Sequence, residues 1–193
     1  MAKKNRETWL NELVSDLRPI YRKRGYTLPR KLRVSVGWPS KSIRKVIGQC
    51  FYEGGSADDS IEIFISPMLD DPMRVADVLV HELCHAAVGG GHGHGPVFKR
   101  CADTFDLGGK PTATTATPEL LEWLAPLVKA RGKYPHAALQ PTGGKKQTTR
   151  LLKASCGCGY VVRVTRKWAE QASPRCGLCT DEYGDYEEMH IHW

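Results

Sequence analysis

The segment His81-Glu82-Leu83-Cys84-His85 constrains the fold and chemistry of this chain more than any other. Residues four apart share one face of a helix, so both histidines can reach a single metal ion if the segment is helical. Glu82 would then project beside the ion, where a zinc hydrolase needs a general base for its metal-bound water. A catalytic zinc site usually has three protein ligands plus water, and His92 and His94 are both candidates for the third.

The alternative is a helix that exposes two polar histidines to solvent. The segment 75–80, directly before the motif, is strongly apolar, which indicates a largely buried helix. Buried polar groups without partners are costly, so buried histidines need a ligand or another partner. Glycines that follow His85 allow a sharp turn, which can bring another histidine back toward the helix. The residues therefore favour a catalytic-type zinc site.

Length and composition limit the class of protein. The chain has 193 residues, of which 41% are hydrophobic, and this indicates one domain or one domain with a small module. No segment is long and apolar enough to span a membrane, and no apolar signal core follows the basic segment 1–6. We therefore expect a cytoplasmic, not a secreted, protein without a membrane partner. In a reducing compartment, the seven cysteines favour metal ligands or free thiols over disulfides.

Charge is distributed in blocks along the sequence. The segments 1–48 and 129–175 each carry a net charge of +10, whereas 49–128 carries −8 and 176–193 carries −5. Such blocks indicate a polyanionic partner, for example nucleic acid. A solvated surface of mixed charge is the alternative, and charge alone favours neither.

The order of the expected elements predicts two folded parts. Residues 1–131 are expected to form a compact catalytic domain, 132–149 a linker, and 150–193 a small C-terminal module. Strands followed by a metal-bearing helix predict an α+β class with a zincin-like core, in which a small sheet packs on the active-site helix. Strands are predicted over 31–36, 46–52 and 61–65, and helices over 8–24, from the Asp71-Pro72 cap through the motif, over 96–105 and over 119–131.

The C-terminal module contains a second metal-binding pattern. Cys156-Gly-Cys158 and Cys176-Gly-Leu-Cys179 form two close pairs on either side of the β-rich segment 160–164, which predicts a β-rich zinc ribbon. A segment of about 40 residues has too little core to fold well unaided, so the metal would supply folding free energy. The alternative is four free cysteines in a disordered tail. The acidic run 181–188 is expected to be a solvated tail.

Basic and aromatic residues are interleaved along the ribbon, a pattern that suits phosphate contact and base stacking. The alternative is that the aromatic residues Tyr160 and Trp168 form the small core of the ribbon, and the sequence favours neither. The candidate nucleic-acid-binding residues are Tyr160, Arg163, Arg166, Lys167, Trp168 and Arg175.

The segments His81-Glu-Leu-Cys-His85-Ala86 and Gly93-His94-Gly95-Pro96-x-Phe98-Lys99 together resemble the SprT-like zinc metalloprotease family, which includes the Spartan-type DNA–protein crosslink proteases. The resemblance covers residues 7–130 approximately and, because many members also carry a C-terminal zinc ribbon, residues 150–180. In this family the histidine before Gly-Pro is the third zinc ligand. That position corresponds to His94, which leaves His92 as the alternative.

The resemblance implies a DNA-activated, zinc-dependent endopeptidase that acts on DNA-associated or DNA-crosslinked proteins. Zinc held by His81, His85 and His94 would polarise water and the substrate carbonyl, with Glu82 as the general base. A second, structural zinc would be held by Cys156, Cys158, Cys176 and Cys179.

The partners that the resemblance implies are DNA, single-stranded or with single-stranded features, and DNA-bound protein substrates. The expected location is therefore cytoplasmic and nucleoid- or DNA-associated. Two other classes stay open. One is a nucleic-acid-binding accessory protein with structural zinc, which would not need Glu82. The other is a general zinc peptidase with a soluble substrate.

Overall fold

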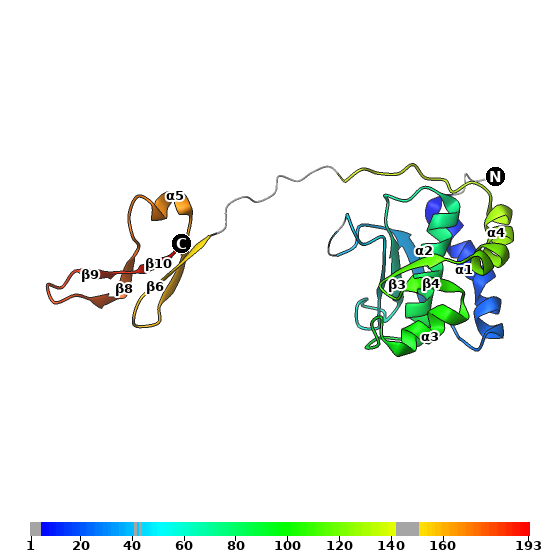
Figure 1. Ribbon diagram of the computed structural model, residues 1–193, viewed down its shortest axis with the longest axis horizontal. Helices are drawn as coiled ribbons and strands as arrows, with labels where there is room; N and C mark the ends of the chain where they lie inside the picture. The colour runs from blue at the N-terminus through cyan, green and yellow to red at the C-terminus, as the bar shows by residue number, and fades with distance from the viewer. Residues whose placement is uncertain (1–4, 41, 43, 142–150) are drawn as a thin grey trace. The chain divides into compact units, whose positions relative to one another are not determined.

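The structure is a computed structural model that describes residues 5–40, 42, 44–141 and 151–193. The chain divides into two compact units, residues 1–141 and 142–193, and both combine helices with small sheets (Figure 1). The predicted α+β class is therefore confirmed. None of the helices in these described ranges is both long and apolar enough to cross a membrane.

The first unit contains a three-stranded sheet, a separate hairpin and four helices among its described residues. The sheet has the order β1-β3-β2, in which β1 runs parallel and β2 antiparallel to β3, so that β2 is an edge strand. The helices and strands predicted for this part of the chain are present, with boundaries that differ by a few residues. Their bounds are α1 (Arg6–Lys23), β1 (Leu32–Val36), β2 (Gly48–Phe51), β3 (Ile61–Ile65), α2 (Pro72–Val88), α3 (Pro96–Thr104), β4 (Leu107–Lys110), β5 (Ala113–Ala116) and α4 (Pro118–Arg131).

Helix α2 lies at the centre of the first unit. It packs against β2 and β3 and also against α3, α4 and β5, so it contacts other elements around most of its circumference. A helix in such a position has to be apolar on nearly every side, which explains the apolar segment 75–80. The Asp71 side chain caps its N-terminus by accepting a hydrogen bond from the Arg74 backbone N–H, and Pro72 follows the cap. Gly89, with φ of +82°, ends the helix in a conformation that favours glycine.

The segment 132–141, which the sequence predicted to belong to a linker, packs on the first unit. The Tyr134 ring is buried 5.1 Å from the Trp9 ring, and the Trp9 indole N–H donates a hydrogen bond to the Gly132 carbonyl. Farther along, the Leu139 backbone N–H donates to the Pro67 carbonyl at 2.8 Å. These contacts extend the first unit beyond the predicted boundary at residue 131. The rest of the predicted linker, 142–149, lies outside the described residues.

The hairpin formed by β4 and β5 was not predicted. Its strands pair antiparallel from Leu107↔Ala116 to Lys110↔Ala113. Leu107 is the only large apolar residue of the segment 107–116, so the alternating apolar pattern that predicts a strand is absent, and the glycines of β4 are unfavourable in strands. Leu107 and Thr114 are the buried positions of the two strands, so burial against α2 and α3 and backbone pairing determine this element.

The second unit consists of two small antiparallel sheets and one helical turn within its described residues. One sheet has the order β10-β6-β7, and β8 pairs with β9. The bounds are β6 (Leu152–Ser155), β7 (Val161–Val164), α5 (Arg166–Ala169), β8 (Arg175–Thr180), β9 (Tyr186–Glu188) and β10 (His190–His192).

The acidic run 181–188, predicted to be a solvated tail, is exposed along its whole length, but its last three residues form strand β9 of the second unit. Tyr186–Glu188 pairs with β8, and Met189 and Ile191 belong to the small buried core. The sequence therefore predicted correctly that the acidic side chains are exposed, but it did not predict the strand. A single buried position between polar neighbours is too weak a pattern to predict a strand.

Candidate metal centres

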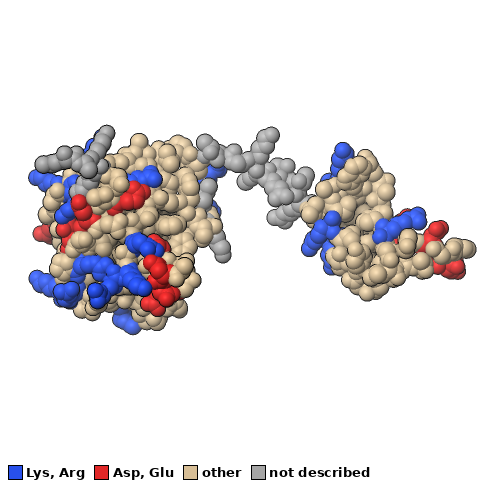
Figure 2. Space-filling view, turned by 180° about the vertical axis from the view of Figure 1, so that it is seen from behind, with Lys and Arg blue, Asp and Glu red and all other residues tan. Residues whose placement is uncertain are grey.

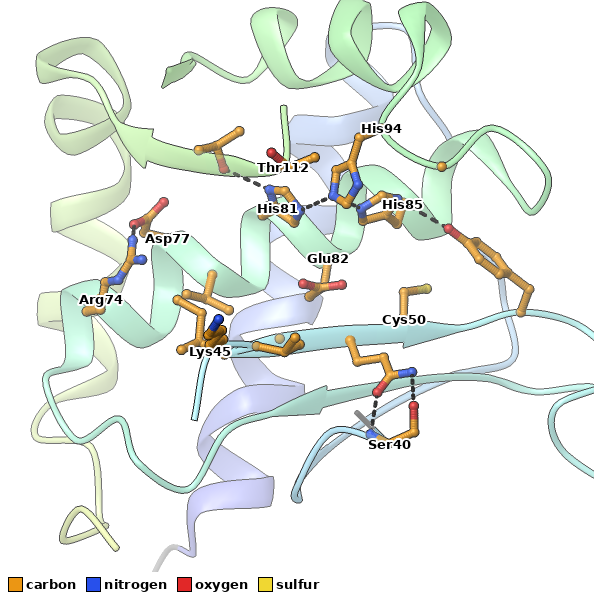
Figure 3. A pocket seen from close by; sticks show the side chains of 18 residues that line it. Ser40, Lys45, Cys50, Arg74, Asp77, His81, Glu82, His85, His94 and Thr112 are labelled. Carbon is orange, nitrogen blue, oxygen red and sulfur yellow. Dashed lines mark hydrogen bonds and ion pairs between the residues drawn. The ribbon is translucent and has the colours of Figure 1, made fainter. Parts of the chain in front are cut away.

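Three histidines converge in the first unit. His81 and His85 are one helical turn apart on α2, and His94 comes from the loop between α2 and α3. The His94 Nε2 atom lies 3.2 Å from His85 Nε2 and 3.4 Å from His81 Nε2 (Figure 3). Tetrahedral zinc with Zn–N bonds of about 2.0–2.1 Å needs nitrogen atoms about 3.3–3.4 Å apart, so this cluster fits zinc. The exposed His92 is not part of the cluster.

The three imidazole rings are held by aromatic and polar neighbours. Phe98, which is fully buried on α3, stacks on His85 with ring centroids 4.1 Å apart, and the rings of His81 and His94 lie 4.9 and 5.1 Å from it. The His81 Nδ1 atom lies 2.7 Å from Thr114 Oγ1. The second nitrogen of the His85 ring, Nδ1, lies 3.2 Å from the hydroxyl of Tyr52.

The environment of the cluster keeps the two helical histidines neutral. Burial, reinforced by neighbouring His94 and Arg74, lowers the pKa of His81 to about 4. Burial and the two other histidines lower the pKa of His85 to about 3. Neutral imidazole is the form that binds metal, so both rings are ready to act as ligands at neutral pH.

Glu82 extends from α2 toward β2, beside the histidines (Figure 3). Glu82 is only 5% exposed, and burial raises the pKa of its carboxyl group to about 8. The space for this side chain exists because the facing residue of β2 is Gly48. A Cβ atom there would lie 2.7 Å from Val78 Cγ1 and 2.9 Å from Glu82 Cδ, closer than atoms can pack. Glycine at this position therefore determines where the carboxylate can lie.

The three histidines and Glu82 line one cleft of about 440 Å³, which lies between α2, β2 and the β4–β5 hairpin. One end of the cleft carries Lys45 and the ion pair of Arg74 with Asp77, and Cys50 lies toward the other (Figure 3). Tyr52 also lines the cleft. None of these residues was singled out from the sequence for the site. Each is far from the His-Glu-x-x-His motif in sequence or lacks a motif of its own, so only the fold brings it to the cleft.

The second candidate centre is formed by four cysteines of the second unit. The Sγ atoms of Cys156, Cys158, Cys176 and Cys179 all lie within 4.8 Å of one another, and all four thiols are free. Cys158 and Cys176 are 3.6 Å apart, close to the spacing of about 3.8 Å that tetrahedral zinc with Zn–S bonds of about 2.3 Å requires. The backbone N–H of Tyr160, followed by the thiol of Cys179, lowers the pKa of Cys158 to about 7. This cysteine cluster could therefore form a zinc ribbon.

The six candidate nucleic-acid-binding residues are all exposed on the second unit. Tyr160 is 43% and Trp168 is 59% exposed, so the alternative in which they form the ribbon core is wrong. The buried residues of this unit are instead small or aliphatic, together with cysteines. Figure 2 shows Lys and Arg side chains on one face of the second unit, with Asp and Glu side chains gathered at one end of the unit.

These features define a class of protein: an α+β chain with three converging histidines and a glutamate in one cleft, an arrangement typical of zinc-dependent hydrolases. A sequence model of the SprT-like family matches residues 10–116, more than half of the chain, and the protein belongs to this family. Membership suggests a metallopeptidase-like function. No curated protein and no solved structure shows significant similarity to the chain. The match includes the whole histidine cluster and ends before the second unit begins.

Proposed function

We propose that the protein is a zinc-dependent endopeptidase that acts on DNA-associated or DNA-crosslinked proteins and is activated by DNA. The observation that carries the peptidase assignment is the convergence of three histidine Nε2 atoms beside the buried Glu82, within one cleft of a SprT-like chain. A purely structural metal site has no need of a buried glutamate at this position. An accessory protein with structural zinc alone is therefore the weaker interpretation.

The residues of the cleft have distinct roles in this proposal. His81, His85 and His94 would hold the zinc ion through Nε2. Bound there, zinc supplies a Lewis acid that activates water and polarises a peptide carbonyl. Glu82 accepts the proton of the attacking water and later passes it to the leaving amine. Burial alone raises the pKa of this carboxyl group, and the positive charge of bound zinc would lower it again, which keeps Glu82 able to accept a proton near neutral pH.

The nucleic-acid part of the proposal is supported by the surface of the second unit. Arg163 and Lys167 are exposed on it, together with the partly exposed rings of Tyr160 and Trp168. Cationic side chains contact phosphates, and exposed aromatic rings stack on unpaired bases, a combination that suits single-stranded DNA. The second unit would hold the DNA while the cleft of the first unit cleaves protein bound nearby.

A general zinc peptidase with a soluble substrate is the second candidate. It is favoured by one observation, namely that every residue lining the cleft belongs to the first unit. The proposed chemistry therefore needs no residue from the DNA-binding surface. DNA dependence of cleavage distinguishes the two candidates.

The test is cleavage of a DNA-bound basic protein, and of the protein itself, by the zinc-loaded full chain with and without single-stranded DNA. Glu82→Gln, which keeps the side-chain shape, is the matched control. We expect cleavage that requires DNA and that falls by roughly 10²–10⁴-fold in Glu82→Gln, because general acid–base catalysis contributes about this much. Zinc content of the variant should equal that of the wild type.

Each other outcome has a defined meaning. Cleavage that depends on Glu82 but is equal without DNA would favour the general peptidase. Cleavage by Glu82→Gln at the wild-type rate would remove this residue from catalysis. Binding of DNA without cleavage of either substrate would favour the accessory protein.

A further inference from the structure

We propose that Thr114 and Tyr52 are positioning residues whose hydroxyl groups hold His81 and His85 with Nε2 turned toward the metal. The inference rests on the proposed function, since it takes the histidine cluster as the zinc site. Both hydroxyls approach the ring nitrogen Nδ1, which faces away from the cluster. They come from two separate parts of the chain, namely the β4–β5 hairpin and the residue that follows β2, and both β5 and β2 pack against α2.

Thr114 makes the closer contact. It is 8% exposed, and its Oγ1 atom lies 2.7 Å from His81 Nδ1 across 33 positions of sequence. An imidazole that binds metal through Nε2 carries its proton on Nδ1, so this nitrogen donates and the threonine oxygen accepts. Backbone pairing of β5 with β4 fixes the position of this oxygen. The hairpin thereby selects one tautomer and one orientation of the His81 ring.

Tyr52 acts on the other helical histidine. Its Oη atom lies 3.2 Å from His85 Nδ1, and the residue is half-buried at the edge of the cleft. The glycine-rich loop after α2 lies close to the ring of Tyr52. A Cβ atom added at Gly90 would lie 3.3 Å from Tyr52 Cγ. Contact with this loop limits the movement of the tyrosine ring and so helps to keep its hydroxyl near His85 Nδ1.

His94 differs from the other two histidines. Among the described residues no side chain or backbone group makes a hydrogen bond to the Nδ1 atom of His94, and His94 is exposed. The cluster therefore combines two oriented rings on a rigid helix with one ring on a loop. Outer groups of this kind typically change metal affinity by about 10–100-fold, so we expect loss of either hydroxyl to weaken zinc binding by roughly 10-fold, or about 1.4 kcal/mol.

The experiment measures zinc content of the full chain at a series of buffered free-zinc concentrations. The binding step that is lost in His94→Ala belongs to the histidine cluster, which separates it from the cysteine site. Thr114→Val removes the hydroxyl at nearly constant shape, and Thr114→Ser retains it. Tyr52→Phe makes the same deletion at His85. Thr112→Val is the matched control, because Thr112 lines the same cleft from the same hairpin, whereas the hydroxyls at the two histidine Nδ1 atoms belong to Thr114 and Tyr52.

We expect the histidine step to shift to roughly 10-fold higher free zinc in Thr114→Val and in Tyr52→Phe, with Thr114→Ser and Thr112→Val close to the wild type. Melting temperatures without zinc report any folding defect at the buried Thr114, and Tyr52→Phe tests the proposal at a half-buried position. Unchanged affinity in both hydroxyl deletions would overturn the proposal, as would an equal loss in Thr114→Ser and Thr114→Val. If no step is lost in His94→Ala, the proposed zinc site itself has failed. None of these readouts requires cleavage.

Discussion

The two candidate metal centres differ in how much protein supports them. The histidine cluster of the first unit lies against a core of buried side chains from all four helices and the three-stranded sheet. The cysteine cluster of the second unit lies in a core of six buried residues, two of which, Cys156 and Cys176, are themselves members of the cluster. In the first unit the core positions the histidines, whereas in the second unit the cysteines themselves make up part of the core.

This difference assigns different roles to the metal. A core as large as that of the first unit can fold without a ligand, and its histidines are then arranged before zinc binds. The core of the second unit is too small for independent stability, so zinc binding there is equivalent to folding. The difference follows from the number of apolar residues that each unit can bury, and substitutions in each unit can test it.

The largest expected effect is loss of folding in the second unit on Cys176→Ser. Cys176 is fully buried, and metal-linked folding free energy in small zinc modules is on the order of 10 kcal/mol. We expect the NMR amide signals of residues 151–193 to collapse toward random-coil positions while those of the first unit stay in place. Cys50→Ser, outside the cluster, is the control. A second unit that keeps its dispersed signals in Cys176→Ser would contradict the comparison.

The corresponding change in the first unit is His94→Ala, for which we expect loss of function without loss of fold. Its side chain is exposed, so removing it should leave the melting temperature of the zinc-free protein nearly unchanged. Cleavage should fall by more than the roughly 10–100-fold expected for an outer-shell residue, because a ligand is lost. His92→Ala, on the same loop, is the matched control. Equal losses in both variants would reopen the assignment of the third ligand.

A smaller effect is expected for Gly48→Ala, which tests how the fold positions Glu82. The added Cβ would overlap the space of Val78 and the Glu82 carboxyl group, so the carboxylate must move. We expect about 1–3 kcal/mol of destabilisation from overpacking and a cleavage rate about 10–100-fold lower, with zinc content unchanged. Thermal unfolding separates the two effects. Normal cleavage by a normally stable Gly48→Ala protein would show that the carboxylate tolerates displacement.

The smallest effect concerns the DNA-binding surface. We expect affinity for single-stranded DNA to fall as salt rises, because bound cations are released from the phosphates. Replacing one phosphate-contacting cation, in Arg163→Gln, should reduce the slope of log affinity against log salt by about 0.7. Lys129→Gln, on α4 of the first unit, is the control. Binding that does not respond to salt would argue against the proposed surface.

The parts that the sequence predicted share one property: their signals are local. The Asp71-Pro72 cap, the apolar run of α2 and the four-residue spacing of His81 and His85 all lie within one helix, and the structure contains that helix. The Cys156/Cys158 and Cys176/Cys179 pairs are equally local, and their sulfur atoms do converge. The periodicity of a sequence reports the spacing of residues within one helix or one strand.

The parts that the sequence missed depend on contacts between distant residues. Thr114 and Tyr52 each lie 33 positions from the histidine that they contact, and neither belongs to a recognisable motif. The β4–β5 hairpin contains glycines and small polar residues, which lack strand periodicity. The segment around Tyr134 resembled a linker because only its packing against Trp9 makes it part of the first unit. Long-range packing of this kind leaves no pattern in a single sequence.

Zinc X-ray absorption of the 193-residue protein, together with its metal content, tests directly whether both candidate centres bind zinc. We expect two zinc ions per chain, one with nitrogen or oxygen ligands at about 2.0–2.1 Å and one with four sulfur ligands at about 2.3 Å. The nitrogen shell should disappear in His94→Ala and the sulfur shell in Cys176→Ser. A wild-type protein that contains only sulfur-coordinated zinc would contradict the assignment of the histidine cluster as a zinc site.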